Sequence, residues 1–379
     1  MTSRCAGKLL LILAGLALLA GLGPVPAGAQ PPNQDIYAAL FPSALDLGRH
    51  QFARPPVEVS VTENLPQQFR CQVAVPSADW RRVPPEFGTG GAQRLAGFVS
   101  PRGINGGVVE VLTHELKVEV NPVDWLLAVM IKAGATILKT RPGWGAAGRT
   151  YEVLALLPKC EDGSARLVRA AVYRSGKRLF VVRCLAREKD FAALTFYFAA
   201  ATLLFKPQPL APEELVGNWA PYCLPAGLCF LGPGQGRAKV PWPGRAVQEA
   251  GYDLSLNGKI TGTLHIKAIQ PPELASATCD QRIKILVQSL KKRGVKVKWQ
   301  GGGVQLHHLA LPGKICFFRG KSWHQGNDLE LYVFSWRGQQ MGALVWMLTV
   351  GQVANLPAWM HNKRTFEIVC QSLKTTGVR

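Results

Sequence analysis

The chain has 379 residues, a formal net charge of +20 and 47% hydrophobic residues. This length suffices for two domains of ordinary size. Such a basic composition is typical of proteins with anionic partners, of which nucleic acid is the usual one, but the N-terminal sequence argues against that partner.

The N-terminal residues have the three-part pattern of a secretory signal. Arg4 and Lys8 precede or begin an apolar run over 9–22, and small residues end the segment at Ala29. A transmembrane anchor is the alternative, but the run is short for a span of ~20 residues and ends in a cleavage-type sequence. We therefore expect a cleaved signal peptide over 1–29 and a periplasmic or secreted mature protein that begins at Gln30.

An exported protein meets little nucleic acid, so an acidic protein, a wall polymer or lipid head groups are better candidates for its partner. A solvated basic surface without a dedicated partner is the simpler alternative. Basic residues concentrate over 291–298, and two tryptophans stand near basic residues, although ordinary packing also explains them. The candidate partner surface comprises Lys291, Lys292, Arg293, Lys296, Lys298, Trp242, Arg245, Lys321 and Trp323.

The first predicted unit, residues 30–210, has a long alternating strand followed by a helix, four strands and a second helix. Asn121 can cap the first helix, with Pro122 in its first turn. The second helix contains an uncharged stretch that is too short to span a membrane. The expected elements are strands at 108–120, 135–140, 149–157, 165–174 and 177–186, and helices at 121–134 and 190–205.

The second predicted unit, residues 211–379, repeats this order. Its first helix has apolar residues at helical spacing and Gly294 as its stop. Both units contain two strands around a glycine, Gly176 in the first and Gly338 in the second. The expected elements are strands at 261–269, 295–299, 304–311, 329–336 and 340–350, a helix at 278–294 and a closing helix that contains 364–373.

Both units therefore have the order β-α-β-β-β-β-α. Each contains an amphipathic antiparallel meander and two helices with an apolar stripe, which is buried when the helices pack on the sheet. We predict an α/β (α+β) fold made of two tandem units, each a mainly antiparallel sheet covered by helices.

The lead into the first unit, Phe69 to Glu86, is extended and contains the spacing P-x-x-x-W from Pro76 to Trp80. With the element order that follows it, this lead resembles the PsbP-like fold. The resemblance implies a protein that binds or braces a larger assembly, without a catalytic motif to carry over. The lead of the second unit, rich in cysteine and glycine over 221–236, departs from the family pattern.

Eight cysteines remain after removal of the signal peptide, and an even number in an oxidising compartment suggests disulfides. In an up-and-down meander, the loop that holds Cys160 lies at the same sheet edge as the end of the strand that holds Cys184, two strands away. We predict a Cys160–Cys184 disulfide on this ground. The close spacing of Cys223 and Cys229 predicts a second disulfide that closes a turn-rich loop.

No catalytic, cofactor-binding or metal-binding residue is predicted. The sequence "GPGQGRAK" at 232–239 lacks the Lys-Ser/Thr ending of a phosphate-binding loop. His307 and His308 are neighbours on a predicted strand and therefore point to opposite faces. No motif pairs a serine or cysteine with a histidine base, which weakens the case for an enzyme without excluding it.

We therefore expect a non-enzymatic binding or assembly protein of a bacterial envelope, which engages an acidic partner, wall polymer or lipid head groups through its basic surface. A carrier that holds a small ligand between the two units is the alternative, and an envelope hydrolase has the least support. Neither a cofactor nor a nucleic-acid partner is expected.

Overall fold

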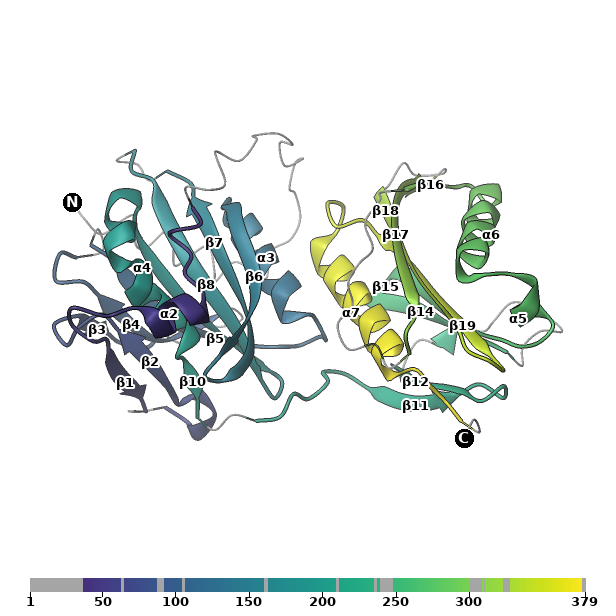
Figure 1. Cartoon of the computed structure of the whole chain (residues 1–379), viewed down its shortest axis with the longest axis horizontal. Helices are drawn as coiled ribbons and strands as arrows, with labels where there is room; N and C mark the ends of the chain where they lie inside the picture. The colour runs from purple at the N-terminus through teal and green to yellow at the C-terminus, as the bar shows by residue number, and fades with distance from the viewer. Residues whose placement is uncertain are drawn as a thin grey trace. The chain divides into compact units, whose positions relative to one another are not determined.

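The computed structural model describes residues 37–376 except 63–64, 87–91, 104–105, 160–162, 209–210, 235–236, 239–247, 300–308, 310 and 323–327. The predicted signal peptide lies outside these residues. The chain forms two compact units (Figure 1). The first comprises the described residues up to Leu116 and Pro122–Leu215, and the second comprises Lys117–Asn121 and the chain from Val216 onward.

An antiparallel sheet of seven strands, in the order β3-β4-β5-β9-β8-β7-β6, forms the centre of the first unit. These strands are β3 (Arg81–Val83), β4 (Gln93–Val99), β5 (Val108–Glu115), β6 (Thr136–Gly145), β7 (Gly148–Leu157), β8 (Arg166–Ser175) and β9 (Arg178–Arg187). A three-stranded sheet contains β1 (Val57–Val61), β2 (Cys71–Val75) and β10 (Lys206–Pro207). The helices are α2 (Ala44–Arg49), η1 (Gln67–Phe69), α3 (Pro122–Lys132) and α4 (Glu188–Leu203).

Helices α4 and α3 cover opposite faces of the large sheet. Side chains alternate along β5, so Val111 faces the core beneath α4 while His114 faces the other side. There the His114 ring stacks on Trp125 of α3, with ring centroids 5.1 Å apart. On the α4 side, the rings of Phe191 and Phe198 are fully buried, and each contributes about 1.5–3 kcal/mol of hydrophobic stabilisation. The predicted fold class, an antiparallel sheet covered by helices, is confirmed.

The second unit has a seven-stranded sheet in the order β13-β14-β15-β19-β18-β17-β16 and a three-stranded sheet in the order β11-β12-β20. The strands of the large sheet are β13 (Arg237–Ala238), β14 (Glu249–Leu256), β15 (Lys259–Ile269), β16 (Val295–Trp299), β17 (Lys314–Ser322), β18 (Asp328–Arg337) and β19 (Gly342–Val350). Those of the small sheet are β11 (Trp219–Cys223), β12 (Leu228–Pro233) and β20 (Lys374–Thr375). The helices are α5 (Glu273–Ser276), α6 (Cys279–Lys292) and α7 (Leu356–Ser372).

The strand orders of the two units correspond position by position. When β13 is set against β3, each later strand of the second unit occupies the place of the matching strand in the first, in the small sheets as well as the large ones. The two hairpins around Gly176 and Gly338 are β8–β9 and β18–β19, which pair next to each other in both large sheets. Gly176 has a φ of 57°, a conformation that glycine adopts without a steric cost.

One predicted strand is wrong. The strand expected at 304–311 does not exist at Leu309 and Leu311, the two described residues of that range, and the strand between β16 and β18 is Lys314–Ser322. Both leucines instead pack against the core beneath α7. The apolar character of these two leucines therefore reflects packing on the core outside a strand.

The first predicted strand ends earlier than expected, because β5 stops at Glu115 and Lys117–Asn121 belong to the second unit. There the carboxylate of Glu119 is fully buried. It accepts a hydrogen bond from the backbone N–H of Val216 at 2.8 Å and another from Nε of Arg364 on α7 at 3.1 Å. The residues that were expected to end the strand therefore include Glu119, whose carboxylate is part of the second unit.

The helices that the structure describes include none that is long and apolar enough to cross a membrane.

Candidate functional site

The C-terminal end of α6 carries three consecutive basic residues, Lys291, Lys292 and Arg293. The helix begins at a capping box, in which the Thr278 hydroxyl accepts from the backbone of Gln281 and the Gln281 side chain accepts from the backbone of Thr278. Basic residues in a last turn interact favourably with the helix dipole. These three side chains are exposed, and their position at the helix end is accounted for without any partner.

The first turn after α6 leads directly into the edge strand of the sheet. Gly294 has a φ of 90°, which favours glycine, and β16 begins at the next residue. On β16, Val297 is buried while Lys296 and Lys298 are exposed. The lysines therefore point to the face opposite the one that α6 covers, because side chains alternate along a strand.

Strand β17 places two more cations directly opposite these lysines. Lys296 pairs with Lys321, and Lys298 pairs with Arg319. All four side chains are exposed. We call these four residues the basic edge, and the basic edge together with Lys291, Lys292 and Arg293 the basic cluster.

Strand β18 carries two acidic residues that lie opposite the cations of β17. Asp328 lies opposite Lys321, and Glu330 lies opposite Arg319. Arg319 Nε and Glu330 Oε1 are 3.2 Å apart, with the arginine side chain 50% exposed. The second oxygen of Glu330, Oε2, accepts a hydrogen bond from Nε1 of Trp359 on α7 at 2.5 Å. On β18, therefore, an acidic residue lies directly opposite each of the two cations of β17.

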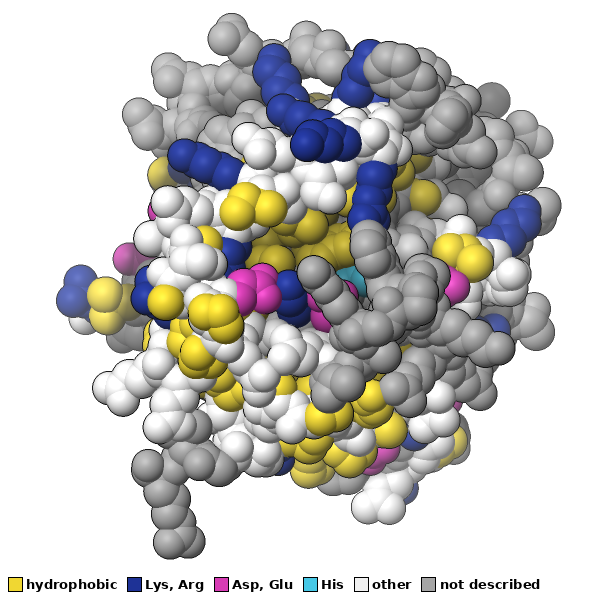
Figure 2. Space-filling model, turned by 90° about the vertical axis from the view of Figure 1, so that its right-hand side faces the viewer, with side chains coloured by type: hydrophobic (Ala, Val, Ile, Leu, Met, Phe, Trp, Pro, Cys, Tyr) yellow, Lys and Arg dark blue, Asp and Glu magenta, His cyan; other side chains and the backbone are white. Residues whose placement is uncertain are grey.

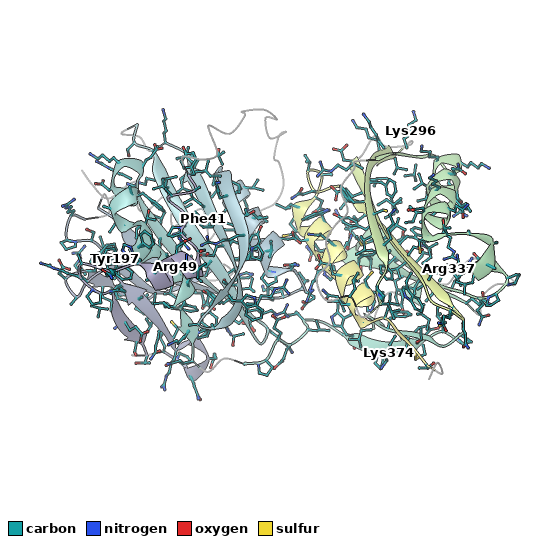
Figure 3. All side chains as sticks on the ribbon, in the orientation of Figure 1. Phe41, Arg49, Tyr197, Lys296, Arg337 and Lys374 are labelled. Carbon is teal, nitrogen blue, oxygen red and sulfur yellow. A yellow bond between two sulfur atoms is a disulfide. The ribbon has the colours of Figure 1, made fainter. Side chains whose placement is uncertain are left out.

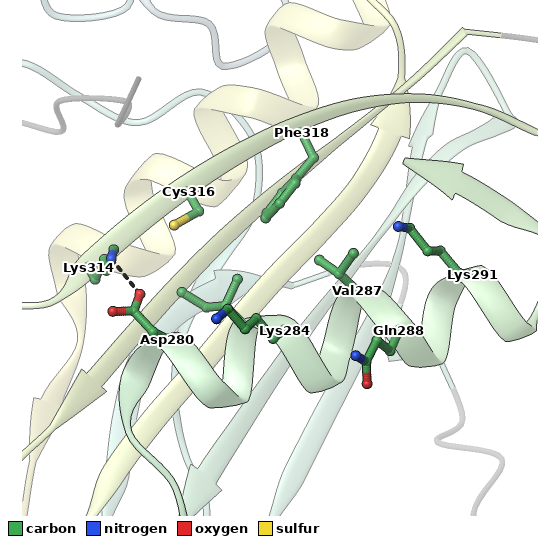
Figure 4. A pocket seen from close by; sticks show the side chains of 9 residues that line it. Asp280, Lys284, Val287, Gln288, Lys291, Lys314, Cys316 and Phe318 are labelled. Carbon is green, nitrogen blue, oxygen red and sulfur yellow. Dashed lines mark hydrogen bonds and ion pairs between the residues drawn. The ribbon is translucent and has the colours of Figure 1, made fainter. Parts of the chain in front are cut away.

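A groove of about 390 Å³ lies between α6 and β17, on the opposite face of the sheet from the basic edge (Figure 4). Its rim includes Lys284 and Lys291, and at one end Lys314 forms an ion pair with Asp280. The apolar lining consists of Ile283, Val287, Cys316 and Phe318. Chemically, the groove combines an apolar surface with cations at its margin.

Figure 2 views the molecule from the right-hand side of Figure 1, where α6 lies. Lysine and arginine side chains gather in the upper part of the view, above a hollowed area where hydrophobic side chains are visible. The cations and the apolar surface are therefore neighbours on one side of the second unit.

The structure describes six residues of the predicted partner surface and places them in two groups: Lys291, Lys292 and Arg293 at the end of α6, and Lys296, Lys298 and Lys321 on the face of the sheet opposite α6. Trp242, Arg245 and Trp323 lie outside the described residues. The sequence reasoning missed Arg319, because the strand before β18 was placed too early. The signal that could have found it is the alternation of Arg319 and Lys321 within "FFRGKS".

The predicted Cys223–Cys229 disulfide is confirmed. It joins two directly paired residues of the hairpin β11–β12, and therefore closes a hairpin rather than the glycine-rich sequence that follows.

The predicted Cys160–Cys184 disulfide is wrong, because Cys184 is a free, fully buried thiol. Cys160 itself lies outside the described residues. Cys184 is aligned through Arg169 with Leu154, three residues before the end of β7. A loop cysteine would have to enter the core beneath α4 to reach it, because Cys184 lies deeper in the sheet than the edge position that the prediction assumed.

Four buried free thiols do not resemble catalytic nucleophiles. Burial raises the pKa of Cys71 to about 12 and also raises the pKa of Cys184, Cys316 and Cys370. A raised pKa suppresses the thiolate, which is the reactive form. Across the described part of the chain, no group of three His, Cys, Asp or Glu residues is arranged to hold a metal ion, and His307 and His308 lie outside that part.

Comparison with known proteins gives low-similarity structural matches. Cyanobacterial PsbP from Synechocystis matches with a TM-score of 0.32 and 11% identity, over 40% of this chain and 92% of that one. LpqN, described as involved in cell envelope biogenesis of Mycobacterium tuberculosis, matches with 0.30 and 16%, over 45% and 99%. The immunity protein TplEi of Pseudomonas aeruginosa matches with 0.24 and 12%, over 84% and 97%. No family model and no curated protein matches the sequence.

Proposed function

We propose that this protein is an exported, non-enzymatic binding protein of a bacterial envelope, built from two PsbP-like units over 30–210 and 211–379. In this proposal the basic cluster of the second unit engages an acidic protein. The signal-like N-terminus supports export, and the matching strand orders of the two units support a tandem origin.

The pairing of like charges on β16 and β17 carries the proposal. Lys296 opposite Lys321, and Lys298 opposite Arg319, are directly opposed across the strands. Like charges in that position destabilise a sheet by roughly 0.2–1 kcal/mol per pair. An apolar or acidic residue at one position of each pair would remove this destabilisation. The sheet itself therefore does not require these cations, whereas binding of an anionic partner does.

A protein partner fits the cluster better than a uniform anionic surface. Asp328 and Glu330 alternate with the cations across the strands, so the face presents a charge pattern rather than a single sign. Patterned charge favours partner choice and orientation. Lipid head groups and wall polymer are therefore outcomes of the test rather than parts of the proposal.

The test measures retention of the mature protein on isolated envelopes at about 0.1 M and about 1 M salt, where the Debye length falls from ~10 Å to ~3 Å. The informative variant is Lys296→Glu with Lys298→Glu, which turns both like-charge pairs into opposite-charge pairs and so preserves the fold. We expect affinity to fall at least about tenfold. The matched control, Lys259→Glu with Lys374→Glu, changes two exposed lysines of the same unit and should bind normally.

Protease treatment of the envelopes identifies the kind of partner. Loss of retention after treatment supports an acidic protein, whereas unchanged retention points to lipid or polymer and overturns that part of the proposal. Equal binding by both double variants, or retention that is insensitive to salt, would show that the basic cluster is not the contact surface.

A further inference from the structure

The groove between α6 and β17 is elongated. Asp280 of α6 and Lys314 of β17 form an ion pair at one end. Val287 and Phe318 lie farther along the groove, and Lys291 lies toward the other end (Figure 4). The helical wall from the first of these α6 residues to the last rises by about 16 Å along the helix axis. The groove therefore has the shape of a slot that fits an extended chain.

The floor of the groove is apolar. Ile283, Cys316 and Phe318 belong to the hydrophobic core between α6 and the sheet, and Val287 packs against that core. The first three are almost fully buried, whereas Val287 is partly exposed. Burial raises the pKa of the Cys316 thiol, so this side chain lines the groove as a neutral group. The floor therefore contacts hydrocarbon but offers no partner to a charged group.

The lysines at the rim differ in whether the protein neutralises them. Lys314 pairs with Asp280, whereas Lys284 and Lys291 form no ion pair with a described residue. The residues after Val216 that lie outside the described part of the chain include no aspartate or glutamate. The rim therefore presents two ammonium groups that no side-chain carboxylate of the second unit neutralises.

The residues at the rim favour a head group with a single negative charge. The described residues that line the groove include lysine and glutamine but no arginine. Arginine has the planar fork that binds phosphate through two hydrogen bonds, whereas the lysine ammonium is a point charge on a flexible stem. The stem of Lys291 can lie along the apolar floor while its ammonium stays at the rim. A carboxylate at the end of a hydrocarbon chain matches this arrangement.

We propose that this groove binds a straight-chain fatty acid, with its carboxylate at Lys291 and its hydrocarbon chain along Val287 and Phe318 toward Cys316. Charge complementarity at the rim and the apolar floor favour this occupant. The volume of about 390 Å³ lies within the range of ~300–1,000 Å³ that is usual for small-molecule sites. The proposed function depends instead on the basic edge, whose Lys296 lies at one end of the sheet (Figure 3).

The probe is dodecanoate, titrated calorimetrically against the full mature protein below the concentration at which the fatty acid forms micelles. Decanoate and octanoate test the hydrocarbon chain, and dodecanol tests the head group. We expect saturable binding that weakens about two- to fourfold for each methylene removed, because full burial of one methylene accounts for about fourfold. Dodecanol should bind about two- to fivefold more weakly than dodecanoate, which is the range for a solvent-exposed ion pair.

A variant of the floor tests whether the chain lies in the groove. Val287→Phe places a larger side chain in the slot and should weaken dodecanoate at least about tenfold. The matched control is Ile285→Phe, a change on the same helix at a side chain that is 60% exposed and does not line the groove. This control should bind dodecanoate normally.

A variant of the rim tests the position of the carboxylate. Lys291→Met removes the charge and keeps an unbranched side chain, so it should weaken dodecanoate about two- to fivefold and leave dodecanol binding unchanged. Lys292→Met is the matched control, because Lys292 is exposed in the same turn of α6 but does not line the groove. It should change neither affinity.

A photoreactive dodecanoate locates the site on the wild-type protein without relying on any variant. Crosslinks within residues 280–291 and 314–318 support the proposal, and crosslinks confined to other segments overturn it. Absence of saturable binding, or equal affinity for octanoate and dodecanoate, also overturns it. None of these outcomes bears on the proposed function, which is tested by the effect of Lys296 and Lys298 on envelope retention.

Discussion

A buried carboxylate in the large sheet of the first unit compensates two arginines. Glu152 of the first unit is fully buried and lies between two arginines, with Arg141 Nη2 and Arg169 Nη2 each 2.6 Å from its oxygens. Thr202 of α4 donates to the same carboxylate at 2.9 Å. Burial alone would lower the pKa of Arg169, and the carboxylate of Glu152 opposes that effect. The carboxylate therefore stabilises two cations that the fold holds away from water.

Glu152→Gln should consequently be strongly destabilising. It removes the negative charge and leaves the guanidinium groups of Arg141 and Arg169 without compensation, which costs about 3–5 kcal/mol for a buried ion pair. Urea unfolding at neutral pH measures this loss. The matched control is Glu273→Gln, which breaks a 2.8 Å pair with Lys267 that is partly exposed; it should cost less than about 1 kcal/mol. Equal costs for the two variants would contradict this account.

Strands and helices of the meanders could be predicted from their own residues, because each has a clear period. Helix α6 follows helical spacing that is visible in the sequence, the hairpins β8–β9 and β18–β19 are apolar runs around a glycine, and α4 is an uncharged apolar run that is too short to span a membrane. Strand β17 was missed because the apolar spacing of Leu309 and Leu311 in the preceding loop resembles that of a strand, although Arg319 and Lys321 alternate along β17 itself.

The candidate site could be predicted only in part, for the same reason. The basic run over 291–298 is contiguous in sequence, but its pairing with Arg319 and Lys321 depends on the register of β16 and β17. Register is set by which face each strand buries. The wrong placement of one strand therefore hid Arg319 and the pairing of Lys321 with Lys296.

Strand β15 contains a histidine that makes stability depend on pH. His265 stacks on Trp346 of β19, with ring centroids 3.9 Å apart. Burial lowers the pKa of His265 from 6.5 to about 4, against a smaller opposing effect of Asp253. Between these two values the unfolded chain binds a proton that the folded chain does not, so the free energy of unfolding falls as the pH falls through this range.

We expect this histidine to cost about 1–3 kcal/mol of stability between neutral pH and pH ~4. Urea unfolding of the wild type and of His265→Gln at several pH values measures it. Other groups titrate in this range as well, so the decisive quantity is the difference between the two proteins. That difference should shift in favour of the variant as the pH falls; a difference that stays constant would show that His265 is not the source.

At the scale of the whole molecule, the boundary between the units does not follow the order of the chain. The sequence suggested a break near 210, and the structure divides the chain at 215 and also assigns Lys117–Asn121 to the second unit. Within that unit, Glu119 contacts Arg364 of α7, and Asn121 donates to Glu367 of the same helix at 3.0 Å. Five residues from within the first unit's sequence thus complete the charge network of the second unit's closing helix.

Glu119→Gln should therefore loosen α7 rather than the helices of the first unit. Glu119 is fully buried and neutralises Arg364, and loss of one partner of a buried pair costs about 3–5 kcal/mol. Hydrogen exchange in the full chain, compared between α7 and α4, should show faster exchange in α7 alone. Glu115→Gln, a nearby change at a carboxylate that is 72% exposed, should leave both helices unchanged. Faster exchange in α4 as well would mean that residues 117–121 stabilise the chain as a whole, and unchanged exchange in α7 would remove them from the second unit.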